Sequence, residues 1–536
     1  MTIRIHDSLT REKRPLEPLE DGLVNMYVCG PTVYDDCHIG HLMGPVVFDT
    51  VARWMLARGL RVRFVNNITD IDDKIINRAQ ETGEAWDAIA ERYTQQYLGY
   101  LSDLGVETIT DHPRCTEYVP QMIAFIQELM DDDIAYVAED GVYFDVHRHE
   151  GYGKLAGRKL EDMQAGARVE AQGGLRHPAD FALWKGVKPG EPSWESPWGP
   201  GRPGWHIECS VMSSELLGRA FDLHGGGDDL KFPHHENEIA QSEARGDGFA
   251  RLWMHNGLVQ YGGRKVAKSD PRMQDPAFRQ QFQARWLLET YGAPALRFFL
   301  VRSPYRRPVD FEPSNLEGAR TGLVRLLRAL GPLAEEPDVT TLTDVLGREL
   351  PEGLAARRDR FVAAMDDDFN TGEAIAELFS LASDARSAPS AAEAETALRL
   401  ARDLGRQLGL FQPGDTERLA DVGGGAEAAL APIAEALVEV RRAARERGAY
   451  EVADSLRDAL TAAGVAVQDA SGTSTVELGG ASEGALTTLM EALIALRAEA
   501  RSAKDFATAD ALRDAVATGG LRFEDGPEGT RWATAD

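Results

Sequence analysis

The sequence predicts an α/β protein with a Rossmann-like N-terminal domain, followed by an α-helical domain and a small duplicated α/β module. Near the N-terminus, a strand-like run at Leu23–Val28 ends at Gly30-Pro31, and apolar residues at helical spacing follow over Val46–Leu56. A second alternating run at Arg61–Asn67 completes a strand–helix–strand unit, which is typical of a doubly wound sheet. Amphipathic helices begin at about residue 315, and an internal repeat lies near the C-terminus.

The composition indicates a protein of the cytoplasm. The chain has 536 residues, enough for three or four domains, and it has no run of eighteen apolar residues. Its first sixteen residues are polar and charged, so we expect neither a secretory signal nor contact with a membrane. The 86 acidic against 58 basic residues argue against a nucleic-acid binder when taken alone. A local basic groove can nevertheless coexist with an acidic remainder, so the charge excludes little.

Further elements follow along the first half of the chain. We expect helix over about Trp86–Met130 and an irregular loop over Lys185–Trp205, which is crowded with proline and glycine. A strand is predicted at Ala220–Leu223, a helix at Pro233–Arg245 and a hairpin-like stretch at His255–Val266.

The second half is predominantly helical. Helices are predicted at Leu316–Leu330 and Thr371–Ala388, and Gly423-Gly424-Gly425 predicts a linker. The expected domains are a catalytic domain at 1–314 with an insertion at about 115–200, a helical bundle at 315–425, and two repeats at 430–479 and 486–536.

The C-terminal repeat is a domain duplication. Each copy reads as a helix, a turn, a second helix and a strand that ends near Asp469 or Asp525. Eight residues recur in register 56 positions later: Leu437, Arg441, Arg445, Ala453, Asp454, Leu456, Arg457 and Asp458 are matched by Leu493, Arg497, Arg501, Ala509, Asp510, Leu512, Arg513 and Asp514.

Two short motifs suit phosphate chemistry. His38-Ile39-Gly40-His41 falls between the first strand and its helix, where a doubly wound sheet presents its ligand crevice. Gly40 would allow close approach of a nucleotide, and His38 and His41 can donate to phosphate oxygens. The loop Lys265–Ser269 carries Lys265 and Lys268, whose ammonium groups can clamp a polyphosphate. Alone, the first motif is equally well interpreted as histidines at a helix start, whereas the second is better interpreted as a solvated turn.

A third motif suits a metal ion. His234 and Glu238 lie one turn apart on the same face of the predicted helix and can supply half of a tetrahedral zinc site. Cys29 and Cys209 are candidates to complete it, although spacing alone favours an exposed acidic helix. The four scattered cysteines are too few for a disulfide framework, and Cys37 and Cys115 are expected to be structural thiols.

Two further stretches lie near these candidate ligands in the sequence: one ends at Cys209, and the other lies between Cys209 and His234. Gly204–Cys209 offers Trp205 as an aromatic wall, and His224–Asp229 combines a triple glycine with Asp229, which can hold an ammonium group. An ordinary surface loop is the simpler interpretation of the glycine-rich run alone.

Together, these strings resemble the cysteinyl-tRNA synthetase family of the class I aminoacyl-tRNA synthetases. The resemblance covers nearly the whole chain, and its matching stretches are Tyr27–Asp35, His38–His41, Asn67–Ile76, Gly204–Ser210, His224–Ser242, Met365–Thr371 and Asp505–Trp532.

The resemblance implies a class I synthetase catalytic domain that forms cysteinyl-adenylate from L-cysteine and ATP with Mg²⁺, and then charges tRNA(Cys). It implies that a single Zn²⁺ binds the thiolate of the substrate, and we expect the protein to be a monomer. Zinc favours thiolate over a hydroxyl, so no editing site is expected. The implied roles are zinc binding by Cys29, Cys209, His234 and Glu238, phosphate contacts by His38, Gly40, His41, Lys265 and Lys268, and a cysteine pocket lined by Thr69, Trp205 and Asp229.

The chain departs from the family pattern at the lysine loop. The usual Lys-Met-Ser-Lys-Ser is replaced by Lys265-Val266-Ala267-Lys268-Ser269. Loss of one loop hydroxyl predicts an enzyme slower by about tenfold, because a hydrogen bond contributes about 0.5–1.5 kcal/mol.

The two repeats also differ from each other. The second copy retains Glu524-Asp525 and Gly529–Trp532, whereas the first lacks the tryptophan. A stacking tryptophan beside arginines suits unpaired bases, so we expect the second copy to read the anticodon and the first to be a spacer or accessory surface. The alternatives are a ligase that joins cysteine to a small-molecule amine, and a non-catalytic paralogue that binds tRNA or cysteine.

Overall fold

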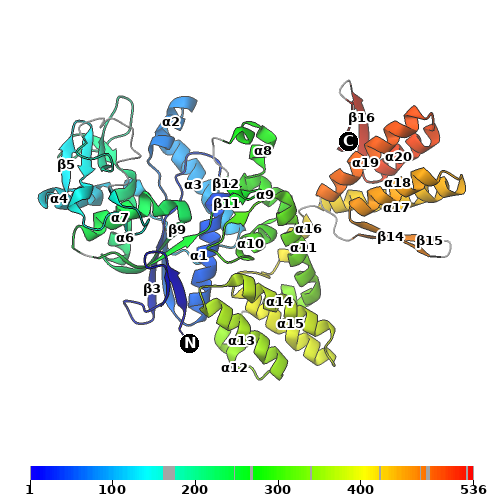
Figure 1. The fold of residues 1–536 in the computed structure, drawn as a ribbon, viewed down its shortest axis with the longest axis horizontal. Helices are drawn as coiled ribbons and strands as arrows, with labels where there is room; N and C mark the ends of the chain where they lie inside the picture. The colour runs from blue at the N-terminus through cyan, green and yellow to red at the C-terminus, as the bar shows by residue number, and fades with distance from the viewer. Residues whose placement is uncertain are drawn as a thin grey trace. The chain divides into compact units, whose positions relative to one another are not determined.

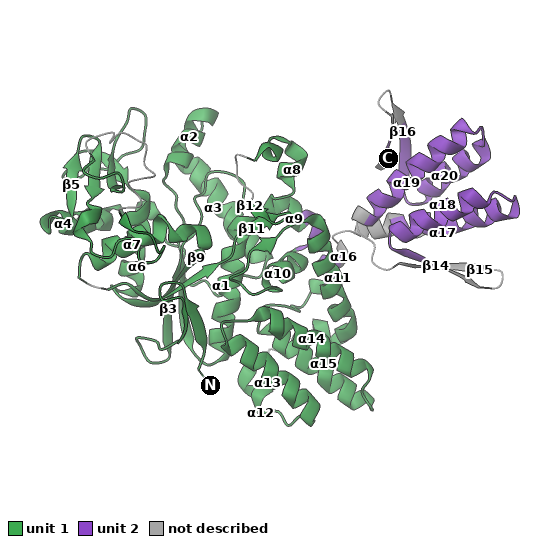
Figure 2. Ribbon diagram, in the orientation of Figure 1, with its two compact units in different colours: residues 1–288, 293–415 green, residues 289–292, 416–536 purple. Residues whose placement is uncertain are grey.

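The computed structural model divides the chain into two compact units (Figures 1 and 2). Unit 1 comprises residues 1–288 and 293–415, and unit 2 comprises 289–292 and 416–536. None of the described helices is both long and apolar enough to span a bilayer. The structure describes residues 2–160, 175–246, 248–265, 270–337, 341–421, 424–470, 473–478, 483–526 and 529–534.

A four-stranded parallel sheet lies at the centre of unit 1, in the order β10-β9-β3-β4 (Figure 1). The strands predicted at 23–28 and 61–67 are confirmed, and the one predicted at 220–223 extends through the triple glycine. A Cβ atom at Gly225 would lie 2.3 Å from the ring of Phe48, so glycine is required where β9 meets the helix α1. The strands are β3 (Leu23–Val28), β4 (Arg61–Asn66), β9 (Phe221–Gly227) and β10 (Ala250–Asn256).

Helix α1 (Ile39–Ala57) connects β3 to β4, as the strand–helix–strand pattern predicts. It is apolar on most sides because it is buried between the sheet and the helices that follow in the chain. The indole Nε1 of Trp54 donates to Oδ1 of Asp366 at 3.0 Å, which ties α1 to α13 (Glu352–Asp366). This hydrogen bond joins the Rossmann-like part of unit 1 to its helical part.

A second, antiparallel sheet lies between β4 and β9 in the chain, where the insertion is expected. Its order is β5-β6-β7-β8. The stretch 185–205, predicted to be irregular, in fact contributes the end of β7 and all of β8. Its strands are β5 (Ala135–Ala138), β6 (Gly141–Phe144), β7 (Phe181–Gly186) and β8 (Gly201–Pro203).

The remaining helices follow the apolar patterns closely. The long helical stretch predicted at 86–130 is two helices, α3 (Trp86–Asp103) and α4 (Val119–Asp131). Those predicted at 316–330 and 371–388 are α11 and α14. Further elements of unit 1 are β1 (Arg4–Asp7), β2 (Glu12–Pro15), α2 (Asp73–Thr82), α6 (Trp205–Leu217), α7 (His234–Glu243), β11 (Val259–Tyr261), β12 (Arg264–Lys265), α8 (Pro276–Gln280), α10 (Ala293–Val301), β13 (Val309–Asp310), α11 (Pro313–Leu330), α12 (Leu342–Gly347), α14 (Thr371–Arg386) and α15 (Ala391–Arg406).

Unit 2 contains the duplicated module, and each copy is two helices followed by a hairpin, where the sequence predicted a single strand. The helices of both copies pack around one shared core, to which the repeated Leu437, Leu456, Leu493 and Leu512 all contribute. The predicted linker at Gly423–Gly425 is instead the start of a helix from Gly424, with residue 423 outside the described residues. The elements are α17 (Gly424–Glu446), α18 (Tyr450–Ala462), β14 (Val465–Ala470), β15 (Thr473–Leu478), α19 (Glu483–Ser502), α20 (Phe506–Thr518), β16 (Leu521–Gly526) and β17 (Gly529–Thr534).

A buried ion pair and its hydrogen bonds join four segments of unit 1. Nη2 of Arg297, on α10, lies 2.5 Å from Oδ2 of Asp49 on α1 and donates to the carbonyl of Leu408. Nη1 donates to the carbonyl of Leu104. Burial alone would raise the pKa of Asp49, but the guanidinium groups of Arg297 and Arg53 hold it below its ordinary value.

Arg297→Met should lower the free energy of unfolding by about 3–5 kcal/mol, because it leaves the Asp49 carboxylate buried with one guanidinium fewer. The denaturant midpoint measures the loss. Arg61→Met is the matched control, since the Arg61–Glu20 pair is exposed and should contribute about 0–1 kcal/mol. Equal losses in the two variants would contradict a role for burial.

Candidate active site and metal centre

The two histidines of the His38–His41 motif begin α1, as predicted. His38 is the N-cap: its Nδ1 accepts from the amide of Gly40, and its own amide donates to Nδ1 of His41. The two rings are stacked, with centroids 3.7 Å apart. A Cβ atom on Gly40 would lie 3.0 Å from the His38 ring, so this glycine makes room for the stacked imidazoles. The pair lies at the start of α1, on the connection that follows the carboxyl end of β3.

The lysine loop begins at the end of a short hairpin. Lys265 is the last residue of β12, which pairs with β11, and Gly262 and Gly263 form the turn between them. Residues 266–269, with Lys268, lie outside the described residues. After the lysine loop, the chain returns to the His38–His41 motif: Gln283 forms a β-bridge with His38, and the carbonyl of Phe282 accepts from the amide of Ile39.

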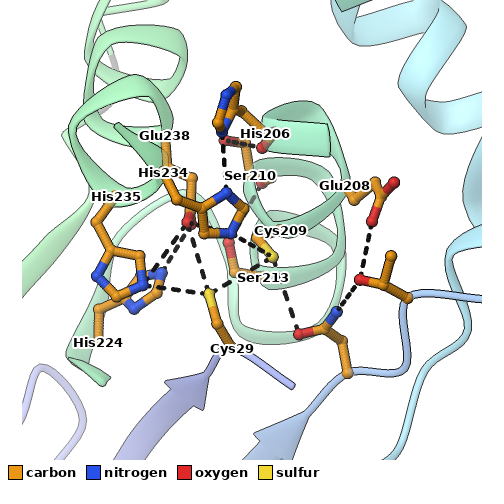
Figure 3. A network of polar contacts seen from close by, with 12 residues as sticks. Cys29, His206, Glu208, Cys209, Ser210, Ser213, His224, His234, His235 and Glu238 are labelled. Atoms are coloured by element: carbon orange, nitrogen blue, oxygen red, sulfur yellow. Dashed lines mark hydrogen bonds and ion pairs between the residues drawn. The ribbon is translucent and has the colours of Figure 1, made fainter. Parts of the chain in front are cut away.

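The four predicted metal ligands converge from three separated segments (Figure 3). Cys29 directly follows β3, Cys209 lies on α6, and His234 and Glu238 lie one turn apart on α7. All except Cys29 are fully buried, and Cys29 is partly buried. Their ligand atoms lie within 4.8 Å of one another.

The spacing of these atoms fits a tetrahedral zinc ion. Cys29 Sγ lies 3.6 Å from Cys209 Sγ and 3.6 Å from Glu238 Oε1. His234 Nε2 lies 3.4 Å from Cys209 Sγ and 3.1 Å from Glu238 Oε1. The edges of a tetrahedron are about 1.6 times its centre-to-corner distance, so zinc bonds of about 2.0–2.3 Å require edges of about 3.3–3.8 Å. Three of the four separations fall in this range, and the fourth, between His234 and Glu238, is slightly shorter, so these separations are close to those that zinc would impose.

A second group of candidate ligands, Cys29, His224, His235 and Glu238, shares two members with the first. It offers one thiolate in place of two, and zinc favours sulfur. His224 Nε2 lies 2.8 Å from Glu238 Oε2, which is a hydrogen-bond distance and too short for a tetrahedral edge. The first group is the better zinc site, and His224 orients its carboxylate.

Further histidines hold the ligands in place. His206 Nδ1 lies 2.9 Å from Nδ1 of His234 and leaves Nε2 of His234 to face the sulfur atoms. His235 contacts Cys29 Sγ at 3.3 Å and continues through His255 to Ser8. These supporting residues were not predicted from the sequence, because no local pattern marks a buried histidine that does not touch the metal.

Without a metal ion, burial disfavours the charged form of every ligand. It raises the pKa of the Cys29 and Cys209 thiols and of the Glu238 carboxyl, and it lowers the pKa of His234. The thiol groups therefore retain their protons until a cation replaces them.

Behind the thiols lies a polar contact that the sequence did not predict. Thr69 Oγ1 donates to Glu208 Oε2 at 3.1 Å and accepts from Asn67 Nδ2. The Cys115 thiol donates to the same Glu208 oxygen at 2.8 Å, a polar partner that the sequence did not predict for this buried thiol. Asn67 Oδ1 in turn lies 3.8 Å from Cys209 Sγ, which connects Thr69 to the ligand group.

The other predicted pocket residues stand at different depths. Trp205, at the start of α6, is partly buried and stacks on the His234 ring with centroids 4.2 Å apart. Asp229 follows β9 and is exposed to solvent. The structure thus brings Trp205 into contact with the ligand group, whereas Asp229 lies at the surface, between β9 and α7 in the chain.

Comparison with known proteins identifies the family. A family described as the class I (C) tRNA synthetase catalytic domain matches residues 15–321. The chain is 44% identical to a cysteine–tRNA ligase of Alkalilimnicola ehrlichii, over 99% of each chain. The chain belongs to the cysteine–tRNA ligase family. A second such ligase, from Geobacter sp. strain M21, is 42% identical over 99% of each chain.

Two further family models match this member of the cysteine–tRNA ligase family after its catalytic domain. A DALR domain matches residues 360–412, within the helical part of unit 1. The cysteinyl-tRNA ligase anticodon binding domain matches residues 427–476, which is the first repeat. From the sequence, the second repeat was expected to be the copy of this kind.

Solved structures support the fold class of the family. A Mycobacterium tuberculosis methionyl-tRNA synthetase in complex with methionyl-adenylate aligns with a TM-score of 0.53 at 15% identity, covering 76% of this chain and 94% of that one. The class I synthetase catalytic fold, Rossmann-like and followed by a helical domain, is thereby confirmed.

Zinc binding should release at least two protons per ion near pH 7, because the pKa of both thiols is raised in the metal-free chain. Affinity should therefore rise with pH, by up to about tenfold per pH unit for each proton released. Calorimetry in buffers of different ionisation enthalpy counts the protons. Cys209→Ser should show no zinc binding and no proton release, and binding to the parent chain without proton release would contradict the assigned ligands.

Proposed function

We propose that the protein activates L-cysteine with ATP to form cysteinyl-adenylate, and then transfers the cysteinyl group to the terminal ribose of tRNA(Cys). The observation that carries this proposal is the two-thiol ligand group that includes Cys29 at the end of β3, with the His38–His41 motif at the start of the next helix, in a chain 44% identical to a cysteine–tRNA ligase. It acts in the cytoplasm as a monomer, with one Zn²⁺ per chain.

Selection of the substrate begins at the metal centre. Zinc held by Cys29, Cys209, His234 and Glu238 would bind a thiolate much more strongly than the hydroxyl of serine. Trp205 covers the His234 side of the group and limits the space for larger side chains. Asn67 and Thr69 stiffen the floor beneath Cys209, since both are buried and hydrogen-bonded to each other.

The remaining groups of cysteine need polar partners. Asp229, which is exposed and lies between β9 and α7 in the chain, is assigned to the substrate ammonium, whose positive charge its carboxylate complements. With the sulfur and the ammonium both held, the carboxylate of cysteine is oriented toward the α-phosphate of ATP. Such positioning converts attack on phosphorus into an effectively unimolecular step.

The phosphates of ATP are assigned to the start of α1 and to the lysine loop. His38 and His41 donate hydrogen bonds as negative charge develops on the transferring phosphoryl group, while Gly40 leaves room for both rings. Lys265 and Lys268 neutralise the departing pyrophosphate together with Mg²⁺. Formation of the adenylate joins a carboxylate oxygen of cysteine to the α-phosphorus of ATP and breaks the bond between that phosphorus and the oxygen of the departing pyrophosphate.

Cysteine-dependent exchange of labelled pyrophosphate into ATP, followed by charging of tRNA, should both occur, and serine should support neither. Cys209→Ser should lose zinc and both activities, whereas Cys37→Ser, whose buried thiol is outside the ligand group, should retain its zinc. Metal analysis and the two assays measure this. Exchange without charging would favour a ligase for small-molecule amines, and zinc-bound protein with neither activity would favour a non-catalytic paralogue.

Ala267→Ser, which restores the loop hydroxyl that the family pattern has, should accelerate exchange by up to about tenfold through one added hydrogen bond. Steady-state exchange rates at saturating cysteine and ATP measure the change. Val266→Met is the comparison variant, since it restores the other altered position without adding a hydrogen-bonding group. A rate unchanged by Ala267→Ser would show that the loop works without this hydroxyl.

A further inference from the structure

A carboxyl group that is not one of the metal ligands is buried beside them. Glu208 lies on α6 directly before Cys209, and only 1% of it is exposed. Burying a carboxyl group costs free energy unless its oxygens have partners, and packing alone would be satisfied by an apolar side chain. The contacts of its oxygens indicate why a carboxyl group stands at this position.

One oxygen of Glu208 accepts two hydrogen bonds. Oε2 accepts from the Thr69 hydroxyl at 3.1 Å and from the Cys115 thiol at 2.8 Å. The thiol has a single proton, and its contact with Thr69 Oγ1 is longer, at 3.7 Å, so the proton goes to the carboxyl oxygen. Burial raises the pKa of the Glu208 carboxyl, but Oε2 is an acceptor in the neutral form as well, because an oxygen that faces two donors leaves the acid proton to Oε1.

The side chain of Asn67 fixes the direction of the Thr69 hydroxyl. The backbone amide of Gly30 donates to Asn67 Oδ1 at 2.9 Å, so this oxygen is the acceptor of the side chain and Nδ2 is its donor. Nδ2 donates to Thr69 Oγ1 at 3.3 Å. The hydroxyl therefore accepts from Asn67 and gives its own proton to Glu208. Among the contacts of the described residues, this leaves Oγ1 with one lone pair to offer.

The backbone holds Thr69 in place. Its amide donates to the carbonyl of Pro31 at 3.1 Å, and its carbonyl accepts from the amide of Val33 at 3.3 Å. These bonds tie the segment after β4 to the segment after Cys29. Both segments lie at the carboxyl ends of neighbouring parallel strands, where this fold class presents its ligands. A hydroxyl on such a rigid support provides a contact of fixed direction.

The remaining lone pair of Thr69 suits the ammonium group of the substrate. An ammonium group only donates, whereas a carboxylate only accepts. The ammonium of cysteine is bonded to the carbon next to the one that bears the sulfur, so a substrate with its sulfur on the metal carries the ammonium close to the ligands. Thr69 is close to them too, because Asn67, which donates to it, lies 3.8 Å from Cys209 Sγ through Oδ1. Asp229 is exposed, so water weakens its attraction for the same ammonium.

We propose that Glu208 is a positioning residue of the cysteine site, which holds the Thr69 hydroxyl so that its oxygen accepts a hydrogen bond from the α-ammonium group of the substrate. Without Glu208, the protons of the Thr69 hydroxyl and the Cys115 thiol would be free to occupy the place that the ammonium needs. The role rests on the proposed function, which puts the substrate sulfur on the metal. It allows the site to distinguish cysteine from thiols that have no ammonium group.

The test measures the binding of three thiols to the zinc-loaded full chain by calorimetry, without ATP or tRNA. L-cysteine and cysteamine carry an ammonium group, whereas β-mercaptopropionate carries a carboxylate and no ammonium. Glu208→Met should weaken binding of the first two by about tenfold, as expected for loss of a hydrogen bond to a charged group, and leave β-mercaptopropionate within about twofold. Glu208→Gln keeps an acceptor oxygen on a side chain of the same shape and should bind all three thiols as the parent chain does.

Thr69→Val removes the hydroxyl and leaves the buried carboxyl in place, so it tests the same contact if Glu208→Met does not fold. It should show the same selective loss, and the double variant should show no further loss, because both changes remove one contact. Zinc content should be the same in every variant. Ser213→Ala is the control for packing of α6, since Ser213 is buried there and donates to the carbonyl of Ser210, and it should bind all three thiols as the parent does.

Three outcomes would overturn the role of Glu208. Equal weakening of all three thiols, or loss of zinc, in Glu208→Met would assign Glu208 to the fold or to the metal centre. Unchanged binding of cysteine by Glu208→Met would show that the contact has no effect, and additive losses in the double variant would show that Glu208 acts without Thr69. A parent chain that binds the thiols but exchanges no pyrophosphate would contradict the proposed function and would not affect the assignment of Glu208, which the binding data decide.

Discussion

The parallel pairing of β3 with β9 is the constraint on which the site depends. Val28 pairs with Gly225, and the amide of Cys29 donates to the carbonyl of Gly225 at 3.2 Å. This register brings the end of β3 beside the segment that leads into α7, so that the Cys29 thiol faces the ligands of α7 and lies 3.6 Å from Glu238 Oε1. A shift of one residue would point the thiol to the other face of the sheet.

Burial of the ligand group both fixes the positions of its atoms and disfavours charge on them when no metal ion is bound. Four of the separations between ligand atoms are 3.1–3.6 Å, close to the edges of a tetrahedral zinc site, so a metal ion has little structure to rearrange when it enters. The same burial penalises charge on the thiols and the carboxyl when no cation is present. The site must carry little charge without a metal ion, yet it must supply thiolates to zinc. Both requirements are satisfied because the thiol protons are released when zinc binds.

The sequence predicted those features that depend on residues close together in the chain. The strand at 23–28 and the shared helical face of His234 and Glu238 follow from spacing within a few residues. The pairing of these ligands with Cys29 and Cys209 came from the family resemblance, because no periodicity connects segments that lie so far apart in the chain. The contact between Cys115 and Glu208 was missed for the same reason: it depends on how α6 packs, which neither neighbourhood encodes.

The shared core of the C-terminal module has an evolutionary consequence. A tandem duplication whose copies fold separately can be reversed by losing either one. Here the helices of each copy bury their leucines against those of the other, so removal of one would leave an apolar face in water. Once the copies had come to fold together, selection acted on them as a single object, and divergence of their surfaces became the easier path to new specificity.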